Sequence, residues 1–279
     1  MAVYPIIPSI PRRGIPLDLS SRAQPADLTE LMDQPCTRAD LKTCLRDIGW
    51  VNRTLFGYRP TLRWIESLNL GQFPHIIRIL DVGCGYGDTL RQIEQWAHRR
   101  GTAVQLTGLD LNPDATAIAS EASPVASRIR WVTGNVFTYT PPQPPHLIVS
   151  SLFTHHLSDA DVIRFIQWME SNAVTGWFIN DLSRNIIPYR LFYLFSRIMR
   201  LHPFLQHDGP VSIARAFVKQ DWQGLCVSAG LPAGHAVIQS FTPARLCVSR
   251  RKTRGVPRPS SARAGGQACT GAVPHHQHE

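Results

Sequence analysis

The chain has 279 residues, 43% of them hydrophobic, which is enough to bury a full core. Its net charge is +9, but seven basic residues and one acid lie from Arg245 to Glu279, so this segment carries six of the nine charges. The six cysteines form no C-x-x-C pair, the N-terminus has no apolar signal segment, and no apolar run of about 18 residues lacks charge. These features argue against a cysteine metal site, a disulfide framework, a secretory signal and a transmembrane helix, and they predict a cytoplasmic protein.

Helical spacing begins in the N-terminal part of the chain. Thr37 and Asp40 have the spacing of a capping box, with Asp where Glu is usual, and apolar residues then recur at helical intervals up to Leu55. Gly57 stands where a glycine would end this helix in a left-handed conformation. A second helix is expected over about residues 60–68.

From Arg78 onwards, short β-rich runs alternate with helical stretches. The expected strands are residues 79–82, 105–109, 129–132, 147–150, 177–179, 235–239 and 245–249. The expected helices are residues 89–99, 113–122, 160–171 and 221–229. Such alternation is typical of a mostly parallel sheet that is covered by helices on both faces.

A long apolar and aromatic segment at residues 185–206 interrupts this alternation. At helical spacing, one face carries Leu191, Leu194, Phe195 and Ile198, and another carries Arg190, Tyr193, Arg197 and Arg200. Three interpretations stay open: a helix that packs on the core, a lid over a lipophilic acceptor, and a helix bound to a membrane surface.

A strand that leads into a glycine-rich turn and a helix gives the strongest functional signal. The turn has the pattern Asp-x-Gly-x-Gly-x-Gly, formed by Asp81, Gly83, Gly85 and Gly87. Glycines let the backbone approach a nucleotide-like ligand, but dinucleotide enzymes use G-x-G-x-x-G facing a pyrophosphate. A carboxylate at position 81 would repel a pyrophosphate and could bind an ammonium group. The expected ligand therefore carries an amino-acid end.

A second acid follows at the end of the next expected strand. Asp110 lies 23 residues after Gly87. A carboxylate at the end of this strand can accept hydrogen bonds from both hydroxyl groups of a ribose. The alternative is that Asp110 only caps the helix that begins near Pro113.

With these motifs, residues 78–249 resemble the class I S-adenosylmethionine-dependent methyltransferases, specifically their small-molecule branch. The resemblance implies a Rossmann-like α/β fold: a doubly wound, mostly parallel seven-stranded sheet whose last strand is antiparallel and lies between strands five and six. N-terminal helices and a helical lid between strands five and six would complete it. The implied cofactor is S-adenosyl-L-methionine.

The resemblance also assigns the cofactor-binding residues position by position. They are Asp81, Gly83, Cys84, Gly85, Gly87, Asp110, Leu111, Asn135, Val136 and Ser151. The family commonly has Asp where this chain has Asn135, but an amide oxygen can also accept from the adenine amino group.

Methyl transfer to a phenol or enol also requires a general base. His155 and His156 follow the fourth expected strand, where the family places residues that face the transferred methyl group. Histidine titrates near neutral pH, so His156 and His155 are the first candidates and Asp181 is the alternative. The competing interpretation is that one histidine packs at the strand end and the other faces solvent.

A narrower resemblance concerns the acceptor. The segments from Glu30 to Asp33, from Val51 to Arg53 and from Asn180 to Arg184 are similar to methyltransferases encoded beside type III polyketide synthases. That implies an alkylated pyrone, resorcinol or quinone of secondary metabolism. Arg184 would hold an enolate or phenolate, unless it is a surface arginine. Tyr189 and Tyr193 would contact a flat acceptor, although core packing explains them almost as well.

Other functions are also considered. A nicotinamide-dependent oxidoreductase conflicts with the glycine spacing and with Asp81. A nucleic-acid or membrane-binding module would use the basic tail, but no base-flipping motif is present, so nucleic acid is not expected and membrane contact would be weak. C-methylation of a quinone or lipid, and a non-catalytic partner subunit, stay open. No metal is expected, and the protein would be a monomer or homodimer.

Four regions are predicted along the chain. Residues 1–25 would form a flexible arm and residues 26–72 a helical segment. Residues 73–252 would form the methyltransferase domain, with the lid inserted at about residues 183–215. Residues 253–279, rich in Pro, Gly, Ser and His, would be a disordered basic tail.

Overall fold

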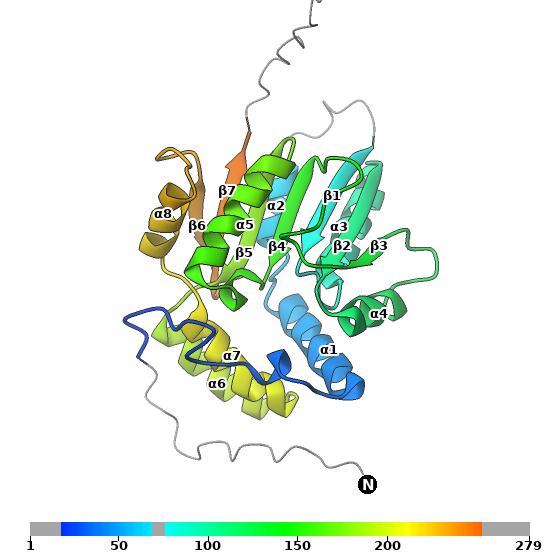
Figure 1. The fold of residues 1–279 in the computed structure, drawn as a ribbon. Helices are drawn as coiled ribbons and strands as arrows, with labels where there is room; N and C mark the ends of the chain where they lie inside the picture. The colour runs from blue at the N-terminus through cyan, green and yellow to red at the C-terminus, as the bar shows by residue number, and fades with distance from the viewer. Residues whose placement is uncertain (1–17, 69–75, 253–279) are drawn as a thin grey trace, which may run out of the picture.

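A seven-stranded sheet forms the centre of the computed structural model, which describes residues 18–68 and 76–252 (Figure 1). The strand order is β3-β2-β1-β4-β5-β7-β6. The strands are β1 Ile77–Val82, β2 Val104–Asp110, β3 Arg130–Thr133, β4 Leu147–Ser151, β5 Gly176–Leu182, β6 Val237–Phe241 and β7 Arg245–Arg251. Strands β1 to β5 pair in parallel, and β7 is antiparallel to both β5 and β6. The predicted sheet, with its last strand inserted between strands five and six, is confirmed.

Helices cover both faces of the sheet, as the apolar strand runs require. They are α1 Arg38–Thr54, α2 Arg59–Ser67, α3 Asp88–Arg100, α4 Pro113–Glu121, α5 Asp159–Asn172, α6 Ile186–Ile198, α7 Pro203–Arg215 and α8 Lys219–Ser228. Alternate side chains of β1 enter two separate cores: Leu80 packs with α5 and α8, and Ile79 packs with α2 and α3. Because successive side chains of a strand point to opposite faces of the sheet, each strand contributes to the cores on both faces.

The N-terminal boundary of α1 follows the predicted capping chemistry. Thr37 Oγ1 accepts from the Asp40 backbone N–H at 3.1 Å and donates to the Asp40 carboxylate at 2.7 Å. At the other end Gly57 takes part in the predicted C-terminal cap, because its N–H donates to the Asn52 carbonyl oxygen at 2.7 Å, but Phe56 and not Gly57 adopts the left-handed φ of 56°. Gly57 is instead a close-approach position, since a Cβ there would lie 2.8 Å from Arg245 Nη2.

The apolar segment after β5 forms a hairpin of two helices. α6 ends at Ile198, Arg200 adopts a φ of 49°, and Pro203 begins α7. The hairpin packs beside α1, where Trp50 stacks on Phe195 with ring centroids 6.1 Å apart. α1, α6 and α7 together cover the carboxyl ends of the parallel strands (Figure 1). The predicted helical insertion between strands five and six is thus present.

Part of the predicted flexible arm is docked on the domain. The Arg22 side chain is almost fully buried; it pairs with Asp159, donates to the carbonyl oxygens of Leu157 and Arg215, and stacks on the Phe217 ring. The end of the predicted arm therefore contacts the domain, while residues 1–17 and the predicted tail lie outside the described residues. Within the described part of the chain, no helix is both long enough and apolar enough to cross a membrane.

The capping of α1 gives a stability prediction. Thr37→Ala removes the side-chain oxygen that accepts from the Asp40 backbone N–H, which has no partner within the helix. The variant should therefore have a free energy of unfolding lower by about 1 kcal/mol. Urea denaturation measures this change. Thr43→Ala is the matched control, because Thr43 is a partly exposed threonine within α1 whose side chain donates to the Ala39 carbonyl oxygen. Equal losses in both variants would contradict the capping role.

Candidate functional site

A cavity of about 840 Å³ opens at the carboxyl ends of β1, β2 and β4. Its walls are the glycine-rich turn, the loops after β2, β3 and β4, helix α1 and the α6–α7 hairpin. This volume lies within the range of small-molecule sites, and the position is where open parallel sheets bind ligands. The sheet, the N-terminal helix and the insertion therefore build one site together.

The glycine-rich turn is shaped by its neighbours as well as by its own backbone. Gly87 has a φ of 72°, and a Cβ there would lie 2.2 Å from the Trp131 ring. Gly83 and Gly85 also have positive φ, and both line the cavity. Gly87 is not part of the cavity lining. Gly87 thus lets the chain enter α3 beneath Trp131, and the other two present their backbone to the cavity.

The carboxylate of Asp81, at the end of β1, is buried with one oxygen unsatisfied. The residue is 1% exposed and lines the cavity. Its Oδ1 has no hydrogen-bond partner within residues 18–68 and 76–252. Burial, assisted by Asp88 and Asp110, raises the pKa of Asp81 well above its usual value. A buried acceptor without a donor is costly, so this site is matched to a ligand that brings a donor or a positive charge.

Asp110 lies beside this turn, at the end of β2. Its Oδ2 accepts from the Gly85 N–H at 2.8 Å and its Oδ1 accepts from the Asn112 N–H at 3.0 Å. Burial raises the pKa of Asp110, and these backbone donors act in the opposite direction. The helix cap of α4 is Asn112, whose side chain accepts from Asp114 N–H at 2.9 Å. The alternative that Asp110 merely caps this helix is therefore wrong.

The remaining predicted cofactor residues gather on the same side of the cavity. Its lining includes Cys84, Leu111, Asn135, Val136 and Ser151. Leu111 is exposed and Val136 is buried, so together they can enclose a flat ring from two sides. Asn135 Oδ1 already accepts from the Phe137 N–H at 2.9 Å, which fixes the amide beside the cavity.

His155 is oriented by a fully buried carboxylate. His155 lies in the short 3-10 helix η3, Thr154–His156, directly after β4. Its Nδ1 is 2.7 Å from Asp181 Oδ1, and Asp181 Oδ2 accepts from Thr154 Oγ1 and from the His155 backbone N–H. Burial alone would raise the pKa of Asp181, but His155 and these donors hold it well below its usual range. An ionised Asp181 can only accept, so Nδ1 carries a proton, and Nε2 faces Glu30 Oε1 at 3.7 Å.

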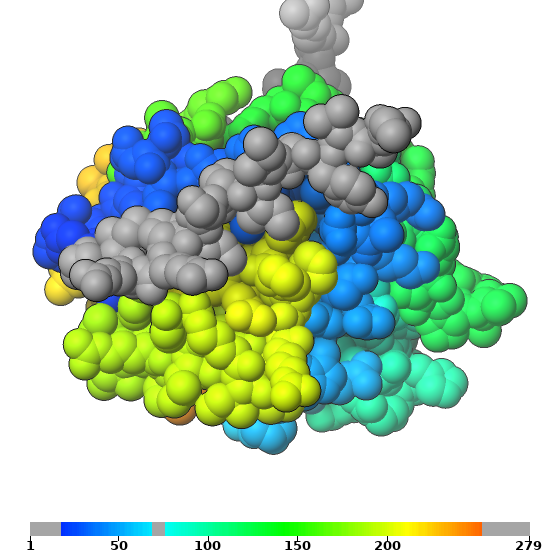
Figure 2. Space-filling view, turned by 90° about the horizontal axis from the view of Figure 1, so that it is seen from below, coloured from blue at the N-terminus to red at the C-terminus, as the bar shows by residue number. Residues whose placement is uncertain are grey.

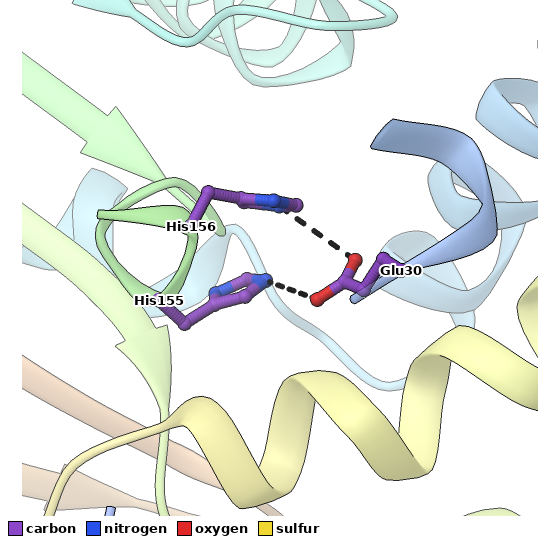
Figure 3. A group of neighbouring side chains, drawn as sticks. All are labelled: Glu30, His155 and His156. Atoms are coloured by element: carbon purple, nitrogen blue, oxygen red, sulfur yellow. Dashed lines mark ion pairs between the residues drawn. The ribbon is translucent and has the colours of Figure 1, made fainter. Parts of the chain in front are cut away.

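His156 has the opposite electrostatic environment. Its Nδ1 is 3.2 Å from Asp33 Oδ1, and its Nε2 is 3.9 Å from Glu30 Oε2. Burial would lower its pKa, but Glu30 and Asp33 outweigh burial and raise the pKa to about 9. His156 is therefore an imidazolium at neutral pH. The two histidine rings lie side by side, with centroids 4.3 Å apart, and both turn Nε2 toward Glu30 (Figure 3).

Glu30 and Arg215 complete this group, and sequence reasoning gave neither a role. Glu30 is 1% exposed, and its Oε1 accepts from Ser212 Oγ at 2.9 Å. Arg215 Nη1 lies 3.3 Å from Glu30 Oε1 and 3.2 Å from Asp33 Oδ2, while its Nε donates to the His155 carbonyl oxygen at 3.0 Å. The only available signal was an acidic pair at positions 30 and 33, because no local pattern distinguishes a buried arginine from a surface one.

Three predicted substrate residues lie outside the cavity. Arg184 donates to the Ala216 carbonyl oxygen at 2.9 Å and to Asp221 at 2.8 Å, so it ties β5 to the start of α8. Tyr193 lies under the Arg197 guanidinium on the outer side of α6, and Tyr189 is absent from the cavity lining. The expected roles of these residues are corrected: the buried Arg184 has structural partners, and neither tyrosine lines the cavity.

Apolar side chains from three helices line the other side of the cavity. They are Leu41, Leu45, Ile48 and Val51 of α1 with Leu55 directly after it, Pro188, Leu191, Phe192 and Phe195 of α6, and Leu205 and Ile213 of α7. This wall faces the polar turn across the cavity. The site therefore has a polar half at the sheet and an apolar half at the helices.

Glu30, His155 and His156 also form the one group of possible metal ligands found among the described residues. Their ligand atoms lie within 4.8 Å of one another. The Arg215 guanidinium already supplies positive charge at 3.3 Å from Glu30. The raised pKa of His156 likewise favours the protonated ring over the neutral form that a metal needs. The arrangement is that of a buried ion-pair network.

Comparison with known proteins gives the class of the fold. Residues 79–173 match the family model of a methyltransferase domain. The plantazolicin methyltransferase BpumL in complex with S-adenosylhomocysteine (SAH) is similar over 77% of this chain and 96% of its own, with 12% identity and a TM-score of 0.55. Human N-acetylserotonin methyltransferase in complex with S-adenosylmethionine is similar over 77% of this chain and 56% of its own, with 15% identity and a TM-score of 0.54. No curated protein matches the sequence.

The sheet order, the glycine-rich turn and the matched domain together define a class I methyltransferase fold. The match covers the first part of this fold, from β1 to the end of α5. The α6–α7 hairpin and the N-terminal helices, which form the apolar half of the site, lie outside the matched residues. We expect these parts of the chain to determine its substrate specificity.

The charge state of His156 can be measured directly. In NMR titrations, its ring should stay protonated up to a pKa of about 9, because Glu30 and Asp33 stabilise the imidazolium. Asp33→Asn and Glu30→Gln should each lower this pKa by removing one negative charge. A wild-type pKa near the ordinary value of about 6.5, unchanged in both variants, would contradict the ion-pair network.

Proposed function

We propose that this chain transfers the methyl group of S-adenosylmethionine to a small lipophilic acceptor with an acidic hydroxyl group. The observation that carries the proposal is the buried carboxyl group of Asp81, which lines the cavity at the glycine-rich turn and has no hydrogen-bond partner for Oδ1 among the described residues. The α-ammonium group of the cofactor would pair with this carboxyl group and favour its ionised form. A dinucleotide would instead bring phosphates to a turn flanked by two carboxylates, Asp81 and Asp110, which disfavours an oxidoreductase.

The rest of the cofactor matches the polar half of the cavity. Asp110 would accept hydrogen bonds from the ribose hydroxyl groups. Leu111 and Val136, which line the cavity, would contact the adenine ring. Asn135 and Ser151 offer polar atoms at the same wall. When bound, the cofactor supplies an electrophilic methyl group on a sulfonium, and the protein's task is to align and deprotonate the acceptor.

Proton removal from the acceptor is assigned to His155. Its Nδ1 proton is held by Asp181, so its Nε2 lone pair can accept the hydroxyl proton. The resulting imidazolium would be stabilised by Asp181 and by Glu30, whose Oε1 lies 3.7 Å from Nε2. The imidazolium of His156 would then stabilise the phenolate or enolate oxygen. This division of roles revises the first choice of His156 as the base, because its pKa is already raised to about 9.

The apolar wall from α1, α6 and α7 favours a flat acceptor with an alkyl or aryl extension. Alkylated pyrones, resorcinols and quinones of polyketide origin have this character, and an acidic hydroxyl on such a ring makes O-methylation the preferred outcome. The proposed setting is secondary metabolism. Screening these three acceptor classes with radiolabelled cofactor tests the proposal, and transfer to none of them would contradict it.

The assignment of Asp110 can be tested without an acceptor. Asp110→Ala should weaken SAH binding about 10- to 100-fold, since it removes charge-assisted hydrogen bonds to the ribose. Isothermal titration calorimetry gives the affinity, with NAD as a ligand that should not bind. Asp114→Ala is the matched control, because Asp114 is a half-exposed acid four residues away that pairs with Arg38. Unchanged affinity in the Asp110 variant would remove it from the cofactor site.

The proton-transfer roles make a different prediction. His155→Ala should lower kcat about 10²- to 10⁴-fold while the SAH affinity changes little. Asp181→Asn should shift the pH–rate profile, because an amide no longer fixes the Nδ1 proton or stabilises the imidazolium. Rapid-quench assays over a pH series measure both. A wild-type rate in His155→Ala would move the base elsewhere, with His156 the next candidate.

Metal dependence gives a third test. Because Arg215 and the His156 proton already balance the charges of Glu30 and Asp33, dialysis against a chelator should leave the rate of methyl transfer unchanged. The assay compares chelated enzyme with enzyme re-supplied with Zn²⁺ or Mg²⁺. Loss of activity on chelation and its recovery with either ion would instead identify Glu30, His155 and His156 as metal ligands.

A further inference from the structure

The outer face of α6 carries a continuous apolar stripe that no described segment covers. Ile187, Leu191, Leu194 and Ile198 follow one another at intervals of four, three and four residues, so they lie on one helical face. They are 64%, 61%, 57% and 67% exposed. Four large aliphatic side chains in a row on a helix surface are typical of an interaction site rather than of ordinary surface.

The charged residues on α6 and directly after it are of one sign. Arg190, Arg197 and Arg200 are exposed on α6 and at its end. No Asp or Glu occurs anywhere in residues 182–207. An apolar stripe bordered by arginines is the pattern of a helix that lies in the interface of a membrane with anionic lipids.

The same helix forms a wall of the cavity. Pro188, Phe192 and Phe195 line the cavity from its inner side, and Leu191 belongs to both the lining and the exposed stripe. Trp50 of α1 stacks on Phe195 and is itself partly exposed, which extends the apolar surface across to α1. Figure 2 shows α6 and α7 beside α1 on this face of the molecule. The stripe therefore borders the apolar half of the site.

We propose that α6 docks this face of the protein on an anionic phospholipid bilayer. The stripe of Ile187, Leu191, Leu194 and Ile198 enters the headgroup region, and the three arginines contact lipid phosphates. A consequence, which rests on the proposed function, is that a lipophilic acceptor reaches the cavity from the bilayer past Leu191. A second copy of the chain fits this face less well. In a two-fold contact centred on the stripe, the arginines of both copies would meet without an acidic partner on α6.

Vesicle flotation tests the docking without cofactor or acceptor. The full chain should bind vesicles of phosphatidylcholine and phosphatidylglycerol, and bind much less to phosphatidylcholine alone or in high salt. The double variant Leu194→Asp/Ile198→Asp should reduce binding at least about tenfold, because neither residue lines the cavity and both would enter the bilayer. In the double variant Arg190→Gln/Arg197→Gln, the affinity for anionic vesicles should fall about fivefold per arginine. Its binding to phosphatidylcholine alone should not change.

Val227→Asp is the matched control, because Val227 is 61% exposed on α8, away from this face. It should bind vesicles like the wild type, and all variants should keep the wild-type SAH affinity. No binding of the wild type to anionic vesicles, or equal losses in the control and stripe variants, would overturn the proposal. A wild-type dimer in sedimentation that the stripe variant dissociates, without vesicle binding, would assign the face to a second copy. The SAH titration reports on the proposed function independently.

Discussion

The buried guanidinium of Arg215 is the interaction on which the site depends. It joins three segments that are far apart in sequence: Glu30 and Asp33 before α1, the His155 carbonyl oxygen in η3, and the end of α7 itself. Without it, the buried Glu30 and the neighbouring, partly exposed Asp33 would have only histidine protons to balance their charges. Losing one member of such a network commonly costs about 3–5 kcal/mol. The N-terminal segment and the helical hairpin therefore close the cavity as one electrostatic unit.

This network also sets the chemistry of two adjacent histidines. Asp181 holds the Nδ1 proton of His155 and turns its Nε2 toward the cavity and Glu30, while Glu30 and Asp33 raise the pKa of His156 to about 9. One ring is then suited to accept a proton and the other to stabilise negative charge, although they are neighbours in sequence. The polar cofactor half of the cavity is built on the sheet, and the apolar acceptor half on the helices. Methyl donor and acceptor would meet between them, beside the two rings.

Much of this arrangement could be predicted from local sequence. The glycine-rich turn with Asp81, the acid at Asp110 and the apolar runs of the parallel strands are short-range patterns, and each was found in its expected place. Partners distant in sequence could not be predicted. Arg184 and Arg215 look equivalent as sequence, yet the first pairs with Asp221 and the second with Glu30, 185 residues away. The break between α6 and α7 and the docking of Arg22 also depend on tertiary contacts.

The central claim is that Asp81 recognises the amino-acid end of S-adenosylmethionine. Calorimetry with SAH and with 5′-methylthioadenosine, which lacks that end, tests it most directly. The account predicts that SAH binds much more tightly than methylthioadenosine to the wild type, and that Asp81→Asn removes most of the difference while methylthioadenosine binding is retained. Equal affinities of the two ligands for the wild type, or a preference for SAH that survives in Asp81→Asn, would contradict it.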